Sequence, residues 1–298
     1  GGVCPAAEQA SIVLDVLRSA CDRLGVQIRT DCDVTAVKPG LSGGVVSVVQ
    51  YERAEQGQDR RDRKCPNKAF DRSHREELSY DRLILATGGK AASVSGSDGS
   101  GYELAKRLGH SVVEPLPALV QLRCDGTFFR ALSGVRAQSE IRLLIDGREA
   151  ARERGELQLT DYGISGIPVF QMSRHAAYGL EAHKAVTVEI NLMPDDREDR
   201  DGYEAFWIKR WAKQDGQTME QFVTGLVNKK IGLMLLKQAQ IKESEKVRNV
   251  SAAYRKRLSE LFCSFTVTVK GTNPFEQAQV CAGGVDCSEV TEDLASVI

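Results

Sequence analysis

The 298-residue sequence lacks several features that would assign a protein class at once. It contains no apolar run of about 18 residues, so we expect neither a transmembrane helix nor a membrane partner. Its eight cysteines form no C-x-x-C pair and show no zinc spacing with histidine, which predicts reduced thiols and no metal site. The opening residues, GGVCPAAEQAS, lack the basic and apolar regions of a signal peptide, so we predict a cytoplasmic protein.

Charge of one sign is not in excess either. Forty Lys and Arg face 41 Asp and Glu, for a formal net charge of -1. Nucleic-acid binding usually requires a clustered basic face, so we predict that nucleic acid is not a partner. The sequence also has no G-x-G-x-x-G fingerprint and no Walker sequence. A different nucleotide-binding enzyme built on the loop at 96–101 is therefore the least favoured interpretation.

The pattern of apolar and polar residues changes twice along the chain. Helix and strand patterns alternate at first, and charged residues 53–79 predict a solvated loop. Short strand patterns separated by Gly, Asp and Pro begin near residue 115, and residues 195–262 show only helical patterns. There the aromatic spacing of Trp207 and Trp211 favours a packed helix face over a ligand platform. The early elements that we expect are a helix at 13–24, strands at 26–30, 34–39 and 43–52, and a helix at 101–108.

This order predicts an α/β domain interrupted by an inserted domain. The α/β domain covers residues 1–114 and returns at 277–298, and the inserted domain covers 115–276. The helical part of the inserted domain lies at about 195–262.

A cluster of small residues follows the apolar run Leu83, Ile84 and Leu85, which predicts a buried strand. The run ends in the turn Ala86, Thr87, Gly88 and Gly89, and further glycines follow at Gly96, Gly99 and Gly101. A glycine has no Cβ, so a flat or phosphorylated ligand can approach its main chain. On these residues alone, a cofactor contact and an ordinary tight turn are equally favoured.

A longer set of motifs in this chain resembles one flavoprotein family. The motifs are ILATGGK, GSDGSGYELAKRLGH, PLPALVQL, GELQLTDYGISGIPVFQMSR and NPFEQAQVCAGGVDCSEV. They are similar, in the same order, to those of the HI0933-like, BaiN-type FAD-dependent oxidoreductases, also described as aminoacetone-oxidase-like. The resemblance implies an FAD-binding domain of the glutathione-reductase type, interrupted by a β-barrel-like domain with a helical subdomain. The fold class it implies is therefore α/β plus β.

The resemblance also implies which residues bind FAD. The backbone at Val34 would contact the adenine, and the turn 86–89 would lie against the pyrophosphate and ribitol. The loop that holds Gly96, Gly99 and Gly101 would contact the cofactor through its backbone, and Gly283 with Gly284 would lie close to the flavin. Ser100 stands where the family has Asp, so only the backbone role of this loop carries over.

Two parts of the family pattern are not in the sequence: an opening G-x-G-x-x-G segment and a closing segment over the flavin. The resemblance therefore implies a fragment that binds FAD weakly or not at all and is inactive by itself. The intact protein would transfer a hydride between FAD and a small or hydrophobic organic substrate, with an electron donor that the sequence does not name.

The residues identify no general acid or base. Tyr162 is a candidate proton donor, and Arg174 and His175 are candidates to meet an anionic or carbonyl substrate. The alternative function is a non-catalytic binding or interaction module built from the barrel and the helices.

Overall fold

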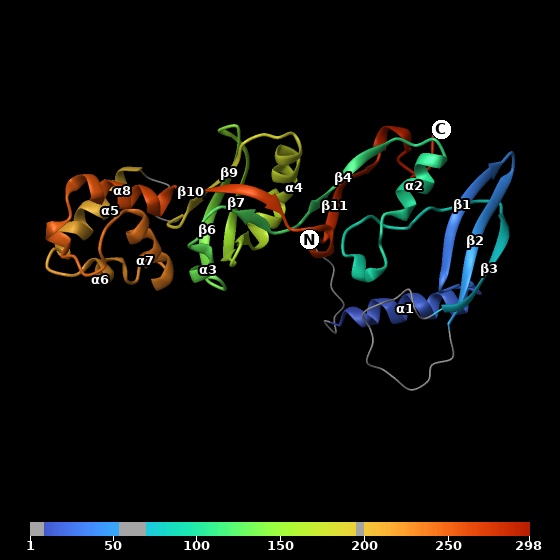
Figure 1. Cartoon of the computed structure of the whole chain (residues 1–298), viewed down its shortest axis with the longest axis horizontal. Helices are drawn as coiled ribbons and strands as arrows, with labels where there is room; N and C mark the ends of the chain where they lie inside the picture. The colour runs from blue at the N-terminus through green and yellow to red at the C-terminus, as the bar shows by residue number, and fades with distance from the viewer. Residues whose placement is uncertain (1–8, 54–69, 195–199) are drawn as a thin grey trace. The chain divides into compact units, whose positions relative to one another are not determined.

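The computed structural model describes residues 9–53, 70–194 and 200–298. The chain forms two compact units, Gly1–Leu85 and Ala86–Ile298 (Figure 1). Among the described residues, none of the helices combines the length and the apolar character needed to cross a membrane.

The described residues of the first unit form a helix and an antiparallel sheet of three strands in the order β1-β2-β3. The elements are α1 (Ala10–Arg23), β1 (Cys32–Gly40), β2 (Gly43–Arg53) and β3 (Phe70–Tyr80). The predicted helix at 13–24 and the strands at 34–39 and 43–52 are confirmed, whereas residues 26–30 form no strand.

The prediction of a solvated loop at 53–79 is wrong for its second part. Residues 54–69 lie outside the described residues, but β3 pairs with β2 along its whole length. The strand tolerates its charges because its side chains reach solvent and find partners across the sheet, as Lys38 and Glu77 do at 3.1 Å. Backbone hydrogen bonds to β2 hold this strand in place, and a hydrophobic pattern gives no information about such bonds.

The prediction of a buried strand at Leu83, Ile84 and Leu85 is also wrong. These residues belong to no strand, and their exposed fractions are 39%, 89% and 37%. No strand among the described residues pairs with them, so neither ladder hydrogen bonds nor packing secures the strand that their β propensity favours.

The second unit contains a closed barrel with the strand order β10-β5-β8-β7-β6-β9, as the family resemblance implies. Its strands are β5 (Leu122–Cys124), β6 (Arg136–Ile145), β7 (Arg148–Leu159), β8 (Gly163–Ser165), β9 (Val186–Asn191) and β10 (Phe265–Thr272). Alternate side chains such as Ile141 and Leu143 on β6 point into a core from which water is excluded. Helix α4 (Ile167–Glu181) packs against β7.

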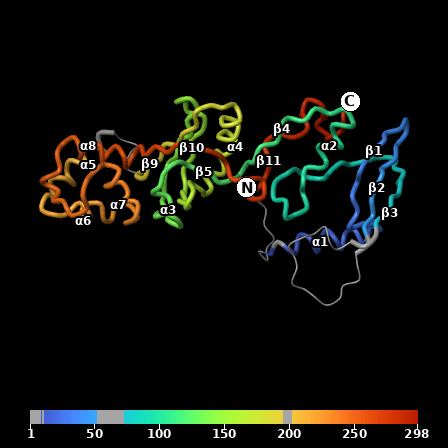
Figure 2. The backbone as a smooth tube through the Cα atoms, in the orientation of Figure 1, coloured from blue at the N-terminus to red at the C-terminus, as the bar shows by residue number. Residues whose placement is uncertain are grey.

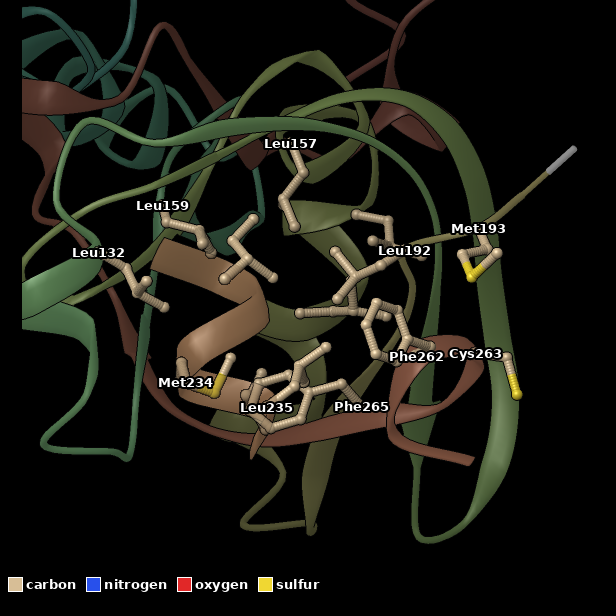
Figure 3. Packing of buried hydrophobic residues seen from close by; sticks show 14 of the residues in the cluster. Leu132, Leu157, Leu159, Leu192, Met193, Met234, Leu235, Phe262, Cys263 and Phe265 are labelled. Atoms are coloured by element: carbon tan, nitrogen blue, oxygen red, sulfur yellow. The ribbon is translucent and has the colours of Figure 1, made fainter. Parts of the chain in front are cut away.

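Among the described residues between β9 and β10, four α-helices share the barrel's hydrophobic core. They are α5 (Arg200–Lys213), α6 (Met219–Val223), α7 (Lys229–Gln238) and α8 (Ala252–Cys263). Figure 3 shows Met234 and Leu235 from this region in the same packed cluster as Leu157 and Leu159 of the barrel. Trp207 and Trp211 are buried, and the Trp211 ring stacks on Phe222 with centroids 4.0 Å apart. The prediction of a packed aromatic face is therefore confirmed, while residues 195–199 of the predicted helical part lie outside the described residues.

Beyond the barrel, β4 (Val112–Ala118) and β11 (Val280–Val285) form an antiparallel pair. The chain enters the barrel after β4 and leaves it toward β11, so these two strands run side by side (Figure 2). We call the two connecting segments, 119–121 and 273–279, the neck. The backbone N–H of Asn273 donates to the Gln121 carbonyl at 3.0 Å and ties the two segments together. Around this pair lie α2 (Ser100–Arg107) and the short helices η2 (Ser93–Ser95), η4 (Phe275–Gln277) and η5 (Cys287–Glu289). Helix α3 (Phe129–Leu132) instead contributes to the barrel's hydrophobic core and contacts α7.

Candidate functional site

The turn at 86–89 packs so closely that Gly89 has no room for a side chain. A Cβ on Gly89 would lie 2.8 Å from the Tyr102 hydroxyl and 3.1 Å from the Cys281 sulfur. A Cβ on Gly101 would lie 1.8 Å from Oγ1 of Thr87. Gly88 has a φ of +73°, a conformation that favours glycine. The turn and the start of α2 are therefore built against each other through glycines.

The turn presents unused hydrogen-bond donors. Within the described part of the chain, the backbone N–H groups of Thr87, Gly88 and Gly89 have no partner, whereas the next one, of Lys90, donates to the Cys281 sulfur at 3.3 Å. Successive free N–H groups on a glycine turn are suited to phosphate or carbonyl oxygens. The residues present thus fit a cofactor that approaches the main chain.

Tyr102 lies at the centre of this site. Burial raises the pKa of its phenol, and the neighbouring Cys281 raises it further through its charge and a hydrogen bond. Tyr102 therefore stays a neutral phenol across the physiological range. A Cβ on Gly284 would lie 3.5 Å from the Tyr102 ring, so β11 reaches the same tyrosine as Gly89.

Of the residues that the family resemblance implies, the structure brings Gly88, Gly89, Gly101 and Gly284 together around Thr87, Tyr102 and Cys281. Gly283 is next in the chain, with a φ of +99°. Gly96 and Gly99 lie on the loop before α2, also with positive φ. Val34 is on β1, in the other unit, and is half-exposed.

A cavity of about 270 Å³ opens beside α2. The Lys90 ammonium lies 3.7 Å from Glu114 and 5.8 Å from the Phe275 ring centroid, and the side chain packs on Gly99. Asp98 accepts the backbone N–H of Ser100 at 2.8 Å, and hydrogen bonds from Ser100 lower the pKa of that carboxyl. Asp98 therefore stabilises the start of α2 as an anion.

The candidate catalytic residues lie on two different elements, and of them Tyr162 contacts the neck through Asn273. Tyr162 is in the turn between β7 and β8, where its hydroxyl accepts a hydrogen bond from Asn273 at 2.9 Å. Arg174 and His175 lie on α4, with Nε of Arg174 3.3 Å from Nε2 of His175. The preceding residue, Ser173, accepts the Val120 N–H at 3.3 Å, which attaches α4 to the neck. No described contact joins Arg174 or His175 to Tyr162.

Sequence reasoning missed Tyr102, Cys281 and Asn273. Tyr102 and Cys281 stand inside quoted motifs, but their pairing depends on contact between α2 and β11. Asn273 opens the NPFEQ segment, where a polar residue before proline is typical of an ordinary turn. In the described ranges, no group of three or more His, Cys, Asp and Glu could hold a metal ion.

The sequence of this chain is similar to a family model and to three known proteins. A family model described as HI0933-like protein barrel and H2TH domain matches residues 116–280. A 3-dehydro-bile acid delta(4,6)-reductase from Clostridium scindens is 35% identical over 98% of this chain and 65% of the relative. A ribosomal RNA dihydrouridine synthase from Haemophilus influenzae is 27% identical over 95% of this chain and 62% of its own length. A second one, from Escherichia coli, is 24% identical over 72% of this chain and 50% of its own length. The chain thus spans less than two thirds of each of these relatives.

Proposed function

Because this chain belongs to the HI0933-like family of the BaiN type, we propose that it is part of an FAD-dependent oxidoreductase. The observation that carries the proposal is the glycine turn around Tyr102, with its free N–H groups and no room for a side chain at Gly89. FAD bound there would supply hydride chemistry. The N–H groups of Thr87, Gly88 and Gly89 would hold the cofactor.

The names of the relatives suggest the class of bond that is reduced. One relative is named for reduction at the 4,6 positions of a 3-dehydro bile acid, and the others for forming dihydrouridine. In both cases the carbon–carbon double bond is conjugated to a ring carbonyl, at C3 of the steroid and at C4 of the uracil. We propose that the substrate of this protein shares that feature: a double bond conjugated to a carbonyl.

RNA is the second candidate substrate. The whole chain is nearly neutral, but residues 200–263 hold thirteen Lys and Arg against seven Asp and Glu. A regional excess of positive charge attracts phosphate backbones even where the total charge is balanced. This count supports RNA as a candidate beside a free small molecule, against the expectation from the net charge alone.

The experiment compares the 298-residue chain with the product of its whole reading frame, each supplied with FAD. The flavin is reduced without oxygen, and a 3-oxo-4,6-diene steroid or a uridine-containing RNA is then added. We expect one of the two to reoxidise the flavin and to gain two hydrogens by mass spectrometry. A protein that binds no FAD in either form would instead support the non-catalytic binding module. Flavin that neither substrate reoxidises would contradict the proposed reaction.

A further inference from the structure

A polar group that neither the glycine turn nor the barrel core accounts for lies at the neck. Its centre is Asn273, which is 1% exposed. The side-chain Nδ2 of Asn273 lies 2.6 Å from the amide oxygen of Gln277, 2.9 Å from the Tyr162 hydroxyl and 3.3 Å from the amide oxygen of Gln121. We call Gln121, Arg123, Tyr162, Asn273 and Gln277 the neck cluster.

The neck cluster has donors left over. Asn273 donates to the Tyr162 oxygen, so the hydroxyl hydrogen of Tyr162 is free to point elsewhere. The Arg123 guanidinium lies 5.6 Å from the Tyr162 ring centroid and is exposed. Among the described residues, Arg123 forms no ion pair and its side chain forms no hydrogen bond. A guanidinium with free N–H groups therefore lies over the ring of Tyr162, whose hydroxyl hydrogen is also free.

A second polar atom in the same turn also lacks a partner. Within the described part of the chain, the Thr160 hydroxyl is buried and forms no hydrogen bond. Buried polar atoms are rarely left unpaired in proteins, because the loss of water costs free energy. Thr160 precedes Tyr162 by two residues, so the unpaired atom and the free Tyr162 hydroxyl hydrogen belong to one turn, while Arg123 lies on β5. An arrangement needed only to hold the neck together would not require an unpaired hydroxyl and free donors.

The neck cluster adjoins the glycine turn through packed residues. The backbone N–H of Ala92 donates to the Phe275 carbonyl at 3.1 Å, and Phe275 lies two residues before Gln277. Ala91 also packs with Val120 and Ala278 in a small core, and Val120 directly precedes Gln121. A molecule bound at the neck cluster would therefore neighbour the proposed cofactor site.

We propose that the neck cluster binds the carbonyl oxygen of the substrate, with Tyr162 O–H and Arg123 N–H as donors and Asn273 as the positioning residue. Two donors on one oxygen suit a carbonyl that gains negative charge when its conjugated double bond is reduced. Asn273 fixes the orientation of the Tyr162 hydroxyl from a buried position. This inference rests on the proposed function, since it assigns the substrate end of the same reaction.

Fluorine NMR on the chain labelled with 3-fluorotyrosine tests the site without any turnover. The sequence has seven tyrosines, so Tyr162→Phe removes one resonance and assigns it. The probes are a 3-oxo-4-ene steroid and uridine, which carry the same conjugated carbonyl from two sources. We expect one probe to shift the Tyr162 resonance saturably, while the other tyrosines serve as internal controls.

Variants then separate binding from folding. Arg123→Gln should raise the dissociation constant of the probe about tenfold. Asn273→Asp, which keeps the side-chain shape but removes the N–H donors, should raise it about fivefold. Arg257→Gln, at an exposed arginine of α8, should leave it unchanged. Circular dichroism and the retained tyrosine spectrum verify that each variant is folded.

The outcomes distinguish the site from the proposed function. In parallel, the product of the whole reading frame is titrated with FAD, and flavin fluorescence reports its binding. A chain that binds FAD but whose Tyr162 resonance responds to neither probe overturns the neck site alone. A saturable Tyr162 shift without FAD binding supports the site and contradicts the proposed function. A shift that Arg123→Gln and Asn273→Asp leave unchanged also overturns the site.

Discussion

The side-chain amide of Asn273 donates to the Tyr162 hydroxyl at 2.9 Å and thereby joins the end of β10 to the turn between β7 and β8. Because Asn273 is buried, this contact is shielded from water. Replacement of Asn273 with Leu would leave its polar neighbours without their donor. We expect the free energy of unfolding to fall by about 2 kcal/mol, measured by urea denaturation. Asn249→Leu, at an exposed position, is the control, and equal midpoints for the two variants would contradict this account.

The close approach of Gly101 to Thr87 predicts an intolerant position. In Gly101→Ala the new methyl group would meet Oγ1 of Thr87 at 1.8 Å, so α2 or the glycine turn must move. We expect the free energy of unfolding, measured by thermal denaturation, to fall by about 2 kcal/mol, although alanine is the better helix former. Gly216→Ala, with nothing within 4 Å of its Cβ, should be nearly neutral. Thr87→Gly in the same chain should restore part of the loss, and failure of this rescue would show that the clash is not the cause.

The pair of Glu289 and His110 predicts a pH dependence at the end of the chain. Glu289 accepts the Ser111 N–H at 2.8 Å and lies 3.0 Å from Nδ1 of His110. Hydrogen bonds from Ser111, and then His110, lower the pKa of the Glu289 carboxyl. A lowered pKa stabilises the folded state above the ordinary glutamate value of about 4.3, and this contribution is lost as the pH falls through the folded value.

Glu289→Gln should therefore reduce the melting temperature at pH 7 and flatten its fall below about pH 4.5. Glu292→Gln, an exposed carboxylate of the same segment, should leave the profile unchanged. Melting curves between pH 3 and 7 provide the comparison. Parallel profiles for wild type and Glu289→Gln would mean that the neighbours of Glu289 do not lower its pKa in the folded state, and would contradict this prediction.

The positive charge of the helical region predicts salt-dependent RNA binding. Lys237→Glu with Lys242→Glu should weaken the binding of a fluorescent single-stranded RNA about tenfold and reduce its salt slope. Both lysines are exposed and lie on or just after α7. Lys184→Glu, exposed in the turn before β9, is the matched control. Equal losses in all variants would indicate a non-specific charge effect, and undetectable binding by wild type would remove RNA as a candidate.

Elements with a clear internal pattern could be predicted from the sequence. The spacing of Trp207 and Trp211 predicted a packed face, and the structure stacks Trp211 on Phe222. The errors concern elements that depend on distant partners. β3 is highly charged yet pairs with β2, and Leu83 to Leu85 are apolar yet remain unpaired. Local composition reports which side chains prefer burial, but it does not report which strand is available to pair.

The candidate site shows the same division. Gly88 and Gly89 drew notice as small residues after an apolar run, because the need for close approach leaves a trace in composition. Tyr102 and Cys281 meet only through the contact of α2 with β11, across more than half of the chain. Asn273 gains Gln121 and Tyr162 as neighbours from the closure of the barrel. Such contacts have no periodicity by which a single sequence could reveal them.

The most direct test of the central claim is an equilibrium titration of FAD into the product of the whole reading frame, followed by the flavin absorption spectrum. The account predicts one FAD per chain, with an affinity that falls at least tenfold in Gly89→Ala, whose new methyl group would meet Tyr102 and Cys281. Gly216→Ala should bind as tightly as wild type. A protein that binds no FAD, or that binds it equally well in Gly89→Ala, would contradict the placement of a flavin at the glycine turn.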